Sequence, residues 1–550
     1  MRFLSLAAAL SLGLASVAPA QHAGPRAAAA AEFSADRFKS HVAFLADDLL
    51  EGRDTGSRGH EIAAAYVASQ FMGLGLKPAG ANGGWYQQVP FRSAVVEGKP
   101  RFTLTGPSGE TVWESGTEMS VGPSFEAEKE DVSGGIVFAG YGAEAPEFGA
   151  DDYKGLDVRG KVVAVFAGLP KGLPSEIAAH LGDTKLDVAR RHGAIGMITL
   201  PTTASAKGRP FAAIARRHLR PALNWVGPTG KPGESGGFGA SATETAAAAL
   251  FAGAPRSFAD VRAEVDRGLD PRGFELATKL RVERQTKWTT IRSPEVIGLL
   301  PGSDPKLKDE YVILMGHLDH LGMRPTAKPG EDGIYNGALD NAAGVATMLE
   351  AARAFATSPD KPRRSILFIA NTAEEKGLLG ASYYASNPTV PIGKIVAAVD
   401  LDMPLLLYRF TDVIAFGADH SQVGEAVRRA AAQMGLALAP DPMPEENIFV
   451  RSDHYEFVKQ GVPAIMLATG WANGGGDKWK AFLGGTYHSP KDDMSQPIDW
   501  DSGARYARLN YLISRELADA PQRPLWYKGD YFGEAFAPGK PRAARPATVR

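Results

Sequence analysis

Cysteine is absent from the 550 residues of this chain. A protein of this length must therefore fold without disulfide bonds and rely on the burial of apolar side chains. The absence also excludes thiolate metal ligands and a lipid anchor attached through cysteine. Any metal site must be built from His, Asp and Glu, a donor set that suits zinc, manganese or cobalt better than copper(I) or an iron–sulfur cluster.

Neither sign of charge is in excess. The chain has 60 Lys and Arg against 62 Asp and Glu, which gives a formal net charge of -2. Proteins that bind nucleic acid or anionic membrane surfaces usually carry a basic excess or a basic cluster. We therefore expect no nucleic-acid partner.

Long apolar runs are almost absent as well. One lies at residues 3–17, after Arg2 and before the small-residue sequence Ala-Pro-Ala at 18–20, a pattern typical of a signal peptide. We expect residues 1–20 to be such a signal and the protein to be exported, to the periplasm or the extracellular space. No later run reaches 18 apolar residues, so stable membrane insertion is not expected.

The residue composition and the pattern of apolar residues change along the chain, and these changes predict several structural parts. Residues 33–119 begin with two helical segments, and residues 120–270 hold short β-type runs between Gly/Pro turns without a His/Asp/Glu cluster. The segment from 275 to 520 alternates strands and helices, and the tail at 541–550 has a composition typical of disorder. We interpret 120–270 as a β-rich domain inserted between two parts of one larger domain.

The fold class follows from the third of these parts. "YVILMG", "SILFIANT" and "KIVAAVDL" are near-continuous apolar runs, whereas "AAGVATMLEAARAFA" has the period of a helix. Buried parallel strands have near-continuous apolar sequences because helices cover both faces of their sheet. The sequence therefore predicts an α/β fold with a mostly parallel mixed sheet covered by helices.

Candidate ligands follow the predicted strands. Ligands of such sheets bind outside the carboxyl ends of the strands. Most candidates lie at these strand ends, one is an acid before a helix, and one is a histidine in a later loop. They are His317, Asp319, Asp340, Glu374, Glu375, Asp402 and His488. Each alone has an ordinary explanation, such as a helix N-cap or a solvated side chain. Together, two His and three acids with one acid bridging are what a pair of divalent ions requires.

Six motifs resemble the M28 family of zinc peptidases in their order and content. They are "GHLDHLG", "GALDNAAG", "NTAEEKGLLGA", "VDLDM", "RSDHYEFVKQGVPA" and "YHSPKDD". The resemblance covers roughly residues 33–115 and 275–515. The block between, with "DYKGLDVRGKVVAVFAG", resembles a protease-associated (PA) domain.

The resemblance implies two Zn²⁺ ions, or another divalent metal, and assigns the ligands. His317 and Asp402 would hold one ion, His488 and Glu375 the other, and Asp340 would bridge them. The resemblance also implies a cis peptide bond between Asp340 and Asn341.

Further roles are implied for three side chains. Glu374 would act as the general base that takes a proton from the water or hydroxide held by the ions. Asp319 would orient His317, and Tyr487 would donate to the developing oxyanion, with a simple packing role as the alternative. Asp453 and His454 match a motif without an assigned role, and we expect Asp400 to support a ligand or to be structural.

Several functions are compatible with these residues. We expect a metallo-aminopeptidase acting on peptides, because excess carboxylates in the cleft favour a substrate ammonium group. A carboxypeptidase would need cations, for which Arg409 and Arg451 lie near site motifs. A glutaminyl cyclase and a non-catalytic binding protein are further alternatives. Side-chain preference and oligomeric state are left open by the sequence.

Overall fold

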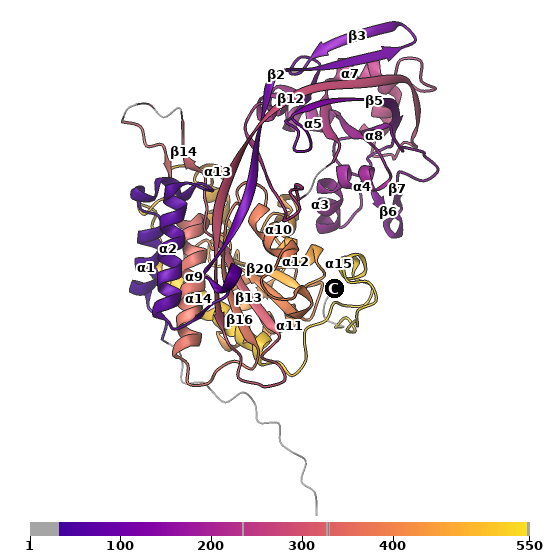
Figure 1. Cartoon of the computed structure of the whole chain (residues 1–550). Coiled ribbons are helices and arrows are strands. Elements are labelled where there is room, and N and C mark those ends of the chain that lie inside the picture. The colour runs from indigo at the N-terminus through magenta and orange to yellow at the C-terminus, as the bar shows by residue number, and fades with distance from the viewer. Residues whose placement is uncertain (1–31, 234–235, 326–327, 329, 547–550) are drawn as a thin grey trace, which may run out of the picture.

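A computed structural model describes residues 32–233, 236–325, 328 and 330–546. The expected signal peptide at residues 1–20 lies outside this part. Among the described residues, no helix combines the length and hydropathy needed to cross a bilayer. The molecule consists of a larger body and a smaller lobe, which two long strands connect (Figure 1).

The body is built on one half of a long mixed sheet. Its strands follow the order β19-β18-β20-β17-β13-β16-β12. The pairs β19–β18, β20–β17, β17–β13 and β13–β16 are parallel, whereas β18–β20 and β16–β12 are antiparallel. The strands are β12 (Phe274–Leu300), β13 (Tyr311–His317), β16 (Ser365–Asn371), β17 (Ile395–Asp400), β18 (Asp412–Phe416), β19 (Ala437–Ala439) and β20 (Ala464–Thr469). The predicted α/β fold with a mostly parallel mixed sheet is confirmed for the body.

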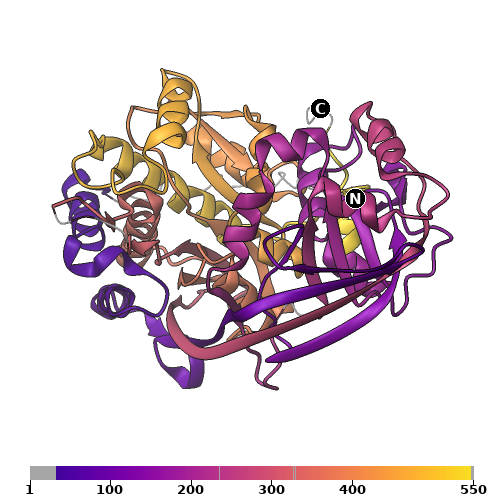
Figure 2. The same cartoon turned by 90° about the horizontal axis from the view of Figure 1, so that it is seen from above.

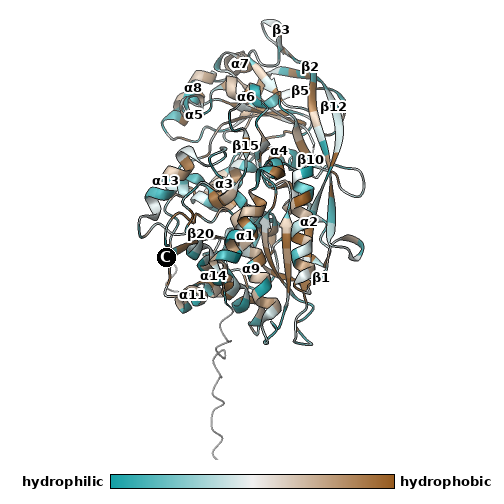
Figure 3. Cartoon of the chain, turned by 90° about the vertical axis from the view of Figure 1, so that its left-hand side faces the viewer, coloured by the Kyte–Doolittle hydropathy of each residue, from teal (hydrophilic) through white to brown (hydrophobic). Residues whose placement is uncertain are grey.

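Helices cover both faces of this sheet, as the apolar strands predict. One face carries α1 (Ala35–Leu45), α2 (Arg58–Gly73), α9 (Ala343–Thr357), α11 (Val423–Gln433) and α14 (Trp500–Asp519). The other carries α10 (Leu379–Ser386), α12 (His454–Lys459) and α15 (Tyr531–Phe536) (Figure 1). Every residue of β16 is buried, and hydrophobic residues concentrate on the central strands (Figure 3). The carboxyl ends of β13, β16 and β17 therefore open at one edge of a rigid core.

The lobe continues the same sheet. Strands β2 (Tyr86–Gly106) and β12 pair over most of their length and run from the body into the lobe (Figure 2). There the sheet continues through β5 (Lys129–Phe138), β8 (Val162–Phe166), β9 (Gly196–Leu200), β11 (Phe238–Ala242) and β4 (Met119–Val121). It carries the helices α3 (Ser175–Asp183), α4 (Lys185–Arg191), α5 (Thr203–Gly208), α6 (Phe211–His218), α7 (Glu244–Leu250) and α8 (Phe258–Asp266).

The borders of the lobe differ from the predicted domain limits at 120 and 270. Strand β3 (Gly109–Glu114) precedes residue 120 and β4 spans it, yet β3 pairs with the outer half of β2 and β4 pairs with β11. The first half of β12, beyond residue 270, pairs with β5. The chain does not enter and leave the lobe through a linker, because β2 and β12 pass through both parts without a break.

The C-terminal part extends the body beyond the predicted end at residue 520. The expectation of a disordered tail at 541–550 is wrong for residues 541–546, and residues 547–550 lie outside the described part. The Arg542 guanidinium donates to the carbonyls of Gly533 and Ala537, and Arg545 donates to the Asp419 carbonyl. These contacts fix a segment that its Pro/Ala/Arg composition alone would leave unfolded.

Helix α3 of the lobe meets the body at a buried junction. His420 of the body contacts Glu176 of α3 through Nε2 and Asp530 through Nδ1, each at 2.6 Å. Burial alone would lower the pKa of His420, but the two carboxylates outweigh burial and raise it to about 10. Close by, His180 of α3 contacts the Tyr455 hydroxyl, and burial lowers its pKa to about 4. One histidine is thus held charged and the other neutral.

The substitution His420→Gln tests this junction through the pH dependence of stability. A pKa raised from about 6.5 to about 10 adds stability that is full below pH 6.5 and is lost as the pH rises through 10. We expect the wild-type protein to unfold at a higher temperature than the variant at pH 6.5, and the two midpoints to converge toward pH 10.5. Thermal unfolding followed by circular dichroism measures both, and a constant difference across this range would contradict the assignment.

Candidate metal centre

The predicted site residues meet at the edge of the body sheet. His317 is the last residue of β13, Glu374 and Glu375 follow β16, and Asp402 follows β17. Asp340 lies in the turn η4 (Ala338–Ala342) before α9. His488 follows α13 (Gly475–Gly485) and has a φ of 53°. A left-handed backbone at a non-glycine residue is costly, so its presence here is consistent with a functional constraint.

One set of donor atoms surrounds His317. Its Nε2 lies 3.3 Å from Asp340 Oδ1 and 3.1 Å from Asp402 Oδ1. All three residues are buried. These are the residues that the sequence predicts for one ion.

A second set faces the other oxygen of Asp340. His488 Nε2 lies 3.2 Å from Asp340 Oδ2 and 3.2 Å from Glu375 Oε2. The two oxygens of Asp340 therefore point to different donor sets, as a bridging carboxylate requires. A further histidine, His320, forms a group with Asp340 and Glu375 whose donor atoms lie within 4.8 Å of one another, close enough to hold a metal ion.

The spacing of these donors fits zinc. Zn²⁺ binds nitrogen and oxygen at about 2.0–2.2 Å in a tetrahedron, whose edges are then about 3.3 Å long. The N···O spacings of 3.1–3.3 Å in both sets match that edge. The donors are nitrogen and carboxylate oxygen only, a set that zinc accepts readily.

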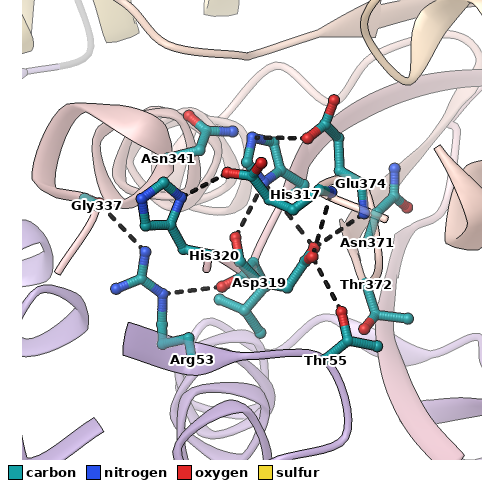
Figure 4. A network of polar contacts seen from close by, with 12 residues as sticks. Arg53, Thr55, His317, Asp319, His320, Gly337, Asn341, Asn371, Thr372 and Glu374 are labelled. Atoms are coloured by element: carbon teal, nitrogen blue, oxygen red, sulfur yellow. Dashed lines mark hydrogen bonds and ion pairs between the residues drawn. The ribbon is translucent and has the colours of Figure 1, made fainter. Parts of the chain in front are cut away.

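Asp319 supports the site differently from the prediction. The Nδ1 atom of His317 lies 3.1 Å from the backbone oxygen of Asp319 and 3.9 Å from its carboxylate. The carboxylate instead accepts the backbone N–H groups of Glu374 and Glu375 and the hydroxyl of Thr55 (Figure 4). Asp319 thus orients His317 through its main chain and the two glutamates through its side chain.

The adjacent acids Glu374 and Glu375 face different surroundings. Ala373, before them, has a φ of 57°, so the chain leaves the extended conformation of β16 at this point. Glu374 Oε2 lies 3.9 Å from His317 Nε2, and burial followed by neighbouring carboxylates holds the Glu374 pKa well above its usual range. Burial alone would also raise the pKa of Glu375, but hydrogen bonds from histidines lower it to about 2. One acid favours its protonated form and the other its carboxylate.

Tyr487 lies against the metal centre. Its ring stacks on the ring of His488, with centroids 3.7 Å apart. Burial and the nearby carboxylates raise the pKa of its phenol, so the group keeps its proton. A protonated phenol can donate a hydrogen bond, which is what the predicted role requires.

The turn that carries Asp340 is held by Asp492, whose importance the sequence did not reveal. The predicted cis bond between Asp340 and Asn341 is present. The Asp492 carboxylate accepts the backbone N–H groups of Leu339 and Asp340 at 3.0 Å. Because Asp492 lies only four residues after His488, it fixes the turn of the bridging acid relative to the histidine loop.

Arg53 is a second residue that sequence reasoning missed. Its side chain is 1% exposed and donates to backbone carbonyls of Leu318, Asn336, Gly337 and Leu45. Figure 4 shows the contact with Gly337. Burial lowers its pKa to about 10, and nearby carboxylates oppose that shift. A charged guanidinium from the N-terminal part thus joins the loop after His317 to the loop before Asp340.

The remaining acids of the motifs lie behind the ligands. The Ser452 hydroxyl lies 2.6 Å from Asp400 Oδ2 and 2.7 Å from Asp402 Oδ2. Asp400 also accepts the backbone N–H of His454, and Asp453 accepts from the Asn371 side chain at 2.8 Å. Asp400 therefore supports a predicted ligand, one of the two roles expected for it.

A cavity of about 60 Å³ opens beside Glu374, Asp402 and Tyr487. Its other walls are mostly apolar: Ile414 and Phe416 from β18, Met466 and Ala468 from β20, and Trp479 and Leu483 from α13. Met443, Glu446, Ile448 and Arg451 close it from the segment before α12. Arg409 is exposed and does not line this cavity.

Residues 295–513 match the model of peptidase family M28. The chain carries a peptidase family M28 domain. This domain contains both predicted donor sets, whereas Arg53 and most of the lobe lie before it in the sequence. The family predicted from the six motifs is confirmed.

Curated relatives of the M28 domain are known in fungi and mammals. A probable zinc metalloprotease of Pyrenophora teres f. teres (strain 0-1) is 38% identical over 108 residues, covering 20% of this chain and 22% of that protein. Another, of Pyricularia oryzae (strain 70-15 / ATCC MYA-4617 / FGSC 8958), is 25% identical over 263 residues, covering 42% and 51%. The aminopeptidase NAALADL1 of Rattus norvegicus is 31% identical over 123 residues, covering 21% and 14%. The matches thus span about half or less of these relatives' length.

The chain is also similar to solved structures of aminopeptidases. The aminopeptidase from Aneurinibacillus sp. strain AM-1 superposes with a TM-score of 0.48 at 19% identity, covering 89% of this chain and 95% of that chain.

The substitution Arg53→Met tests the buried link beside the M28 domain. Four carbonyls would lose a donor in a site that water does not reach, and the surrounding carboxylates would lose a cation. We expect a loss of about 3–5 kcal/mol in the free energy of unfolding, as for other broken buried charge contacts.

Urea unfolding measures this loss, and Arg58→Met is the matched control. Arg58 is exposed in the first turn of α2, so its substitution should change stability by no more than about 0.5 kcal/mol. Equal stability of the two variants would contradict the role assigned to Arg53.

Proposed function

We propose that this protein is an exported two-zinc aminopeptidase, which releases residues from the free N-terminus of peptides. The observation that carries the proposal is the pair of donor sets that share Asp340, next to a cavity bordered by Glu374. The expected export signal and the interpretation of the lobe as a PA domain belong to the same proposal.

The chain supplies the groups that the reaction needs. When bound, the zinc ions supply activation of a water molecule and stabilisation of negative charge. Glu374 accepts the proton of the attacking water at its carboxylate and passes it to the leaving amine nitrogen. Burial and the neighbouring carboxylates raise the pKa of Glu374 and so make it a stronger base than a free carboxylate, provided that the charge of the bound ions keeps it ionised. The Tyr487 phenol donates to the carbonyl oxygen as charge develops on it.

The charges around the cavity favour a substrate ammonium group over a carboxylate. Asp340, Glu374 and Asp402 all border the cavity. Arg451, the cation that a carboxypeptidase could use, is engaged with the Glu446 carboxylate at 3.3 Å and with the Glu446 carbonyl at 3.0 Å. A paired arginine offers less to a substrate carboxylate, so the aminopeptidase is preferred.

The apolar walls of the cavity favour an apolar first residue in the substrate. The side chains that β18, β20 and α13 contribute to the cavity are all uncharged. Burying an aliphatic or aromatic side chain there contributes about 25 cal/mol for each Å² removed from water. A non-catalytic binding protein would not need the complete donor sets together with Glu374, and a glutaminyl cyclase would use the same acids around one ion.

The substitution Glu374→Gln separates catalysis from metal binding. We expect the variant to fold, to bind two zinc ions and to lose at least about 10² in kcat, because the amide cannot accept the proton. Steady-state kinetics with a leucine-derived chromogenic amide and metal analysis of the dialysed protein measure the two properties.

Glu375→Gln is the matched control, since it makes the same change one residue away. It should lower zinc affinity, because Glu375 belongs to a donor set. If Glu374→Gln retained full activity with two ions bound, the general base would be another residue.

Blocking the substrate's amino group tests the direction of cleavage. A charge-assisted contact contributes about 1.5–3 kcal/mol, so acetylation should lower kcat/KM by about tenfold to more than a hundredfold. Hydrolysis of free, N-acetylated and C-amidated forms of one apolar dipeptide measures this. Undiminished cleavage of the acetylated peptide, with none of the amidated one, would establish a carboxypeptidase instead.

A further inference from the structure

Helix α6 and the turns beside it carry positive charge that their neighbours in the chain do not balance. Acidic and basic residues are nearly equal in number over the whole sequence, yet no Asp or Glu occurs between residues 188 and 233. The basic residues of this segment are concentrated at 207–220. The cationic side chains there are all exposed, and they are Lys207, Arg209, Arg216, Arg217 and Arg220.

Other arginines of the lobe have acidic partners. Arg256, Arg262 and Arg281 each contact a carboxylate at 2.6 Å. By contrast, no carboxylate of the described residues lies within ion-pair distance of the five cations at 207–220. In a chain with a net charge of -2, this surface is a local excess of positive charge.

The helix dipole accounts for only part of this cluster. Cations in the last turn of a helix interact favourably with its free carbonyls. Arg216 and Arg217 lie in the last turn of α6, and Lys207 lies in the last turn of α5. Arg209 and Arg220 lie outside both helices. Like charges this close along the chain repel one another, so the cluster gains from an anionic partner.

The inner side of α6 is fixed to the lobe. A ring nitrogen of His218 lies 2.8 Å from the hydroxyl of Ser120 in β4. Burial, followed by the charges of Arg217 and Arg284, lowers the pKa of His218, so the ring is neutral at pH 7. The solvent side of α6 is left to the cations and to Leu219, which is 61% exposed. Figure 3 shows α6 among the other helices of the lobe.

The exposed leucine distinguishes between kinds of anionic partner. Leu219 lies between Arg217 and Arg220 in the sequence and is among the most exposed large apolar side chains of the described residues. A nucleic acid or a purely acidic peptide would pair with the arginines but would leave this side chain in water. An anionic bilayer offers lipid phosphates to the cations and an acyl boundary to the leucine. The combination therefore favours a lipid surface.

We propose that the surface formed by residues 207–220 binds the protein peripherally to bilayers that contain anionic phospholipids. Each Lys or Arg close to such a bilayer typically contributes about fivefold to the affinity. The inference goes beyond the proposed peptidase function and does not depend on the metal centre. Binding to vesicles and hydrolysis of peptides should therefore respond to different substitutions.

Co-sedimentation with vesicles of phosphatidylglycerol and phosphatidylcholine tests the proposal. The processed protein is used, without the expected signal at residues 1–20, so that this apolar segment does not itself bind lipid. We expect binding that weakens with added salt and is lost on vesicles of phosphatidylcholine alone. The combined substitutions Arg216→Gln, Arg217→Gln and Arg220→Gln should lower the affinity about a hundredfold. Leu219→Ser alone should lower it about tenfold.

The matched control combines Arg256→Gln, Arg262→Gln and Arg281→Gln, which remove the same charge from paired arginines of the lobe. It should change the vesicle affinity less than about threefold. Equal losses in the two triple variants, or no loss in the variant at 216–220, would overturn the proposal. Unchanged binding of Leu219→Ser would overturn it too and would indicate a soluble polyanion as the partner.

Hydrolysis of a small peptide in solution separates this inference from the proposed function. All variants should retain the wild-type rate, because none changes a candidate donor or Glu374. A rate lowered only in the variant at 216–220 would assign this surface to substrate binding and would overturn the proposed lipid contact. Absence of hydrolysis by the wild-type protein would instead refute the proposed function and leave the vesicle result unaffected.

Discussion

Buried carboxylates gather at one edge of the body sheet, and their mutual repulsion must be offset for the chain to fold there. Asp319, Asp340, Glu375 and Asp402 lie beside one another with little access to water. Isolated buried charges are costly, so each needs a cation, a hydrogen-bond donor or a proton. Binding two divalent ions would satisfy most of this demand at once, and would stabilise the folded state by mass action.

The remaining negative charge of these carboxylates is balanced by a cation and hydrogen-bond donors of the chain itself. The Arg53 guanidinium places a fixed positive charge below the centre while its donors go to backbone carbonyls. The carboxylate oxygens of Asp319 and Asp492 accept hydrogen bonds from backbone N–H groups. These hydrogen bonds fix the loops of Glu374 and Asp340. The same contacts that neutralise the acids therefore also set the geometry of the candidate donors, so the stability of this edge and the arrangement of the donors are coupled.

The sequence predicts that the candidate donors lie together because their positions follow from local patterns. Apolar runs locate the ends of β13, β16 and β17, and parallel strands bring those ends together regardless of the loops between them. Arg53 gives no such signal, because its partners at Leu318 and Asn336 lie more than 250 residues away. His320 was visible in the motif "GHLDHLG", but only its contact with Glu375 separates it from a solvated loop histidine. The sequence did not reveal the borders of the lobe, because β2 and β12 continue through both parts without a change in their residue pattern.

The lobe and the cavity are connected through the segment before α12. The short turns η6 (Pro444–Glu446) and η7 (Ile448–Val450) contact α3 of the lobe, and the same segment supplies Met443, Ile448 and Arg451 to the cavity wall. Helix α3 is in turn fixed to the body through Glu176 and His420. Since one wall of the cavity contacts the lobe through η6 and η7, a shift of α3 would alter the space inside the cavity. The donors on the rigid sheet would stay in place. The arrangement of the candidate donors thus depends on the sheet, whereas the shape of the cavity depends also on how the lobe is held.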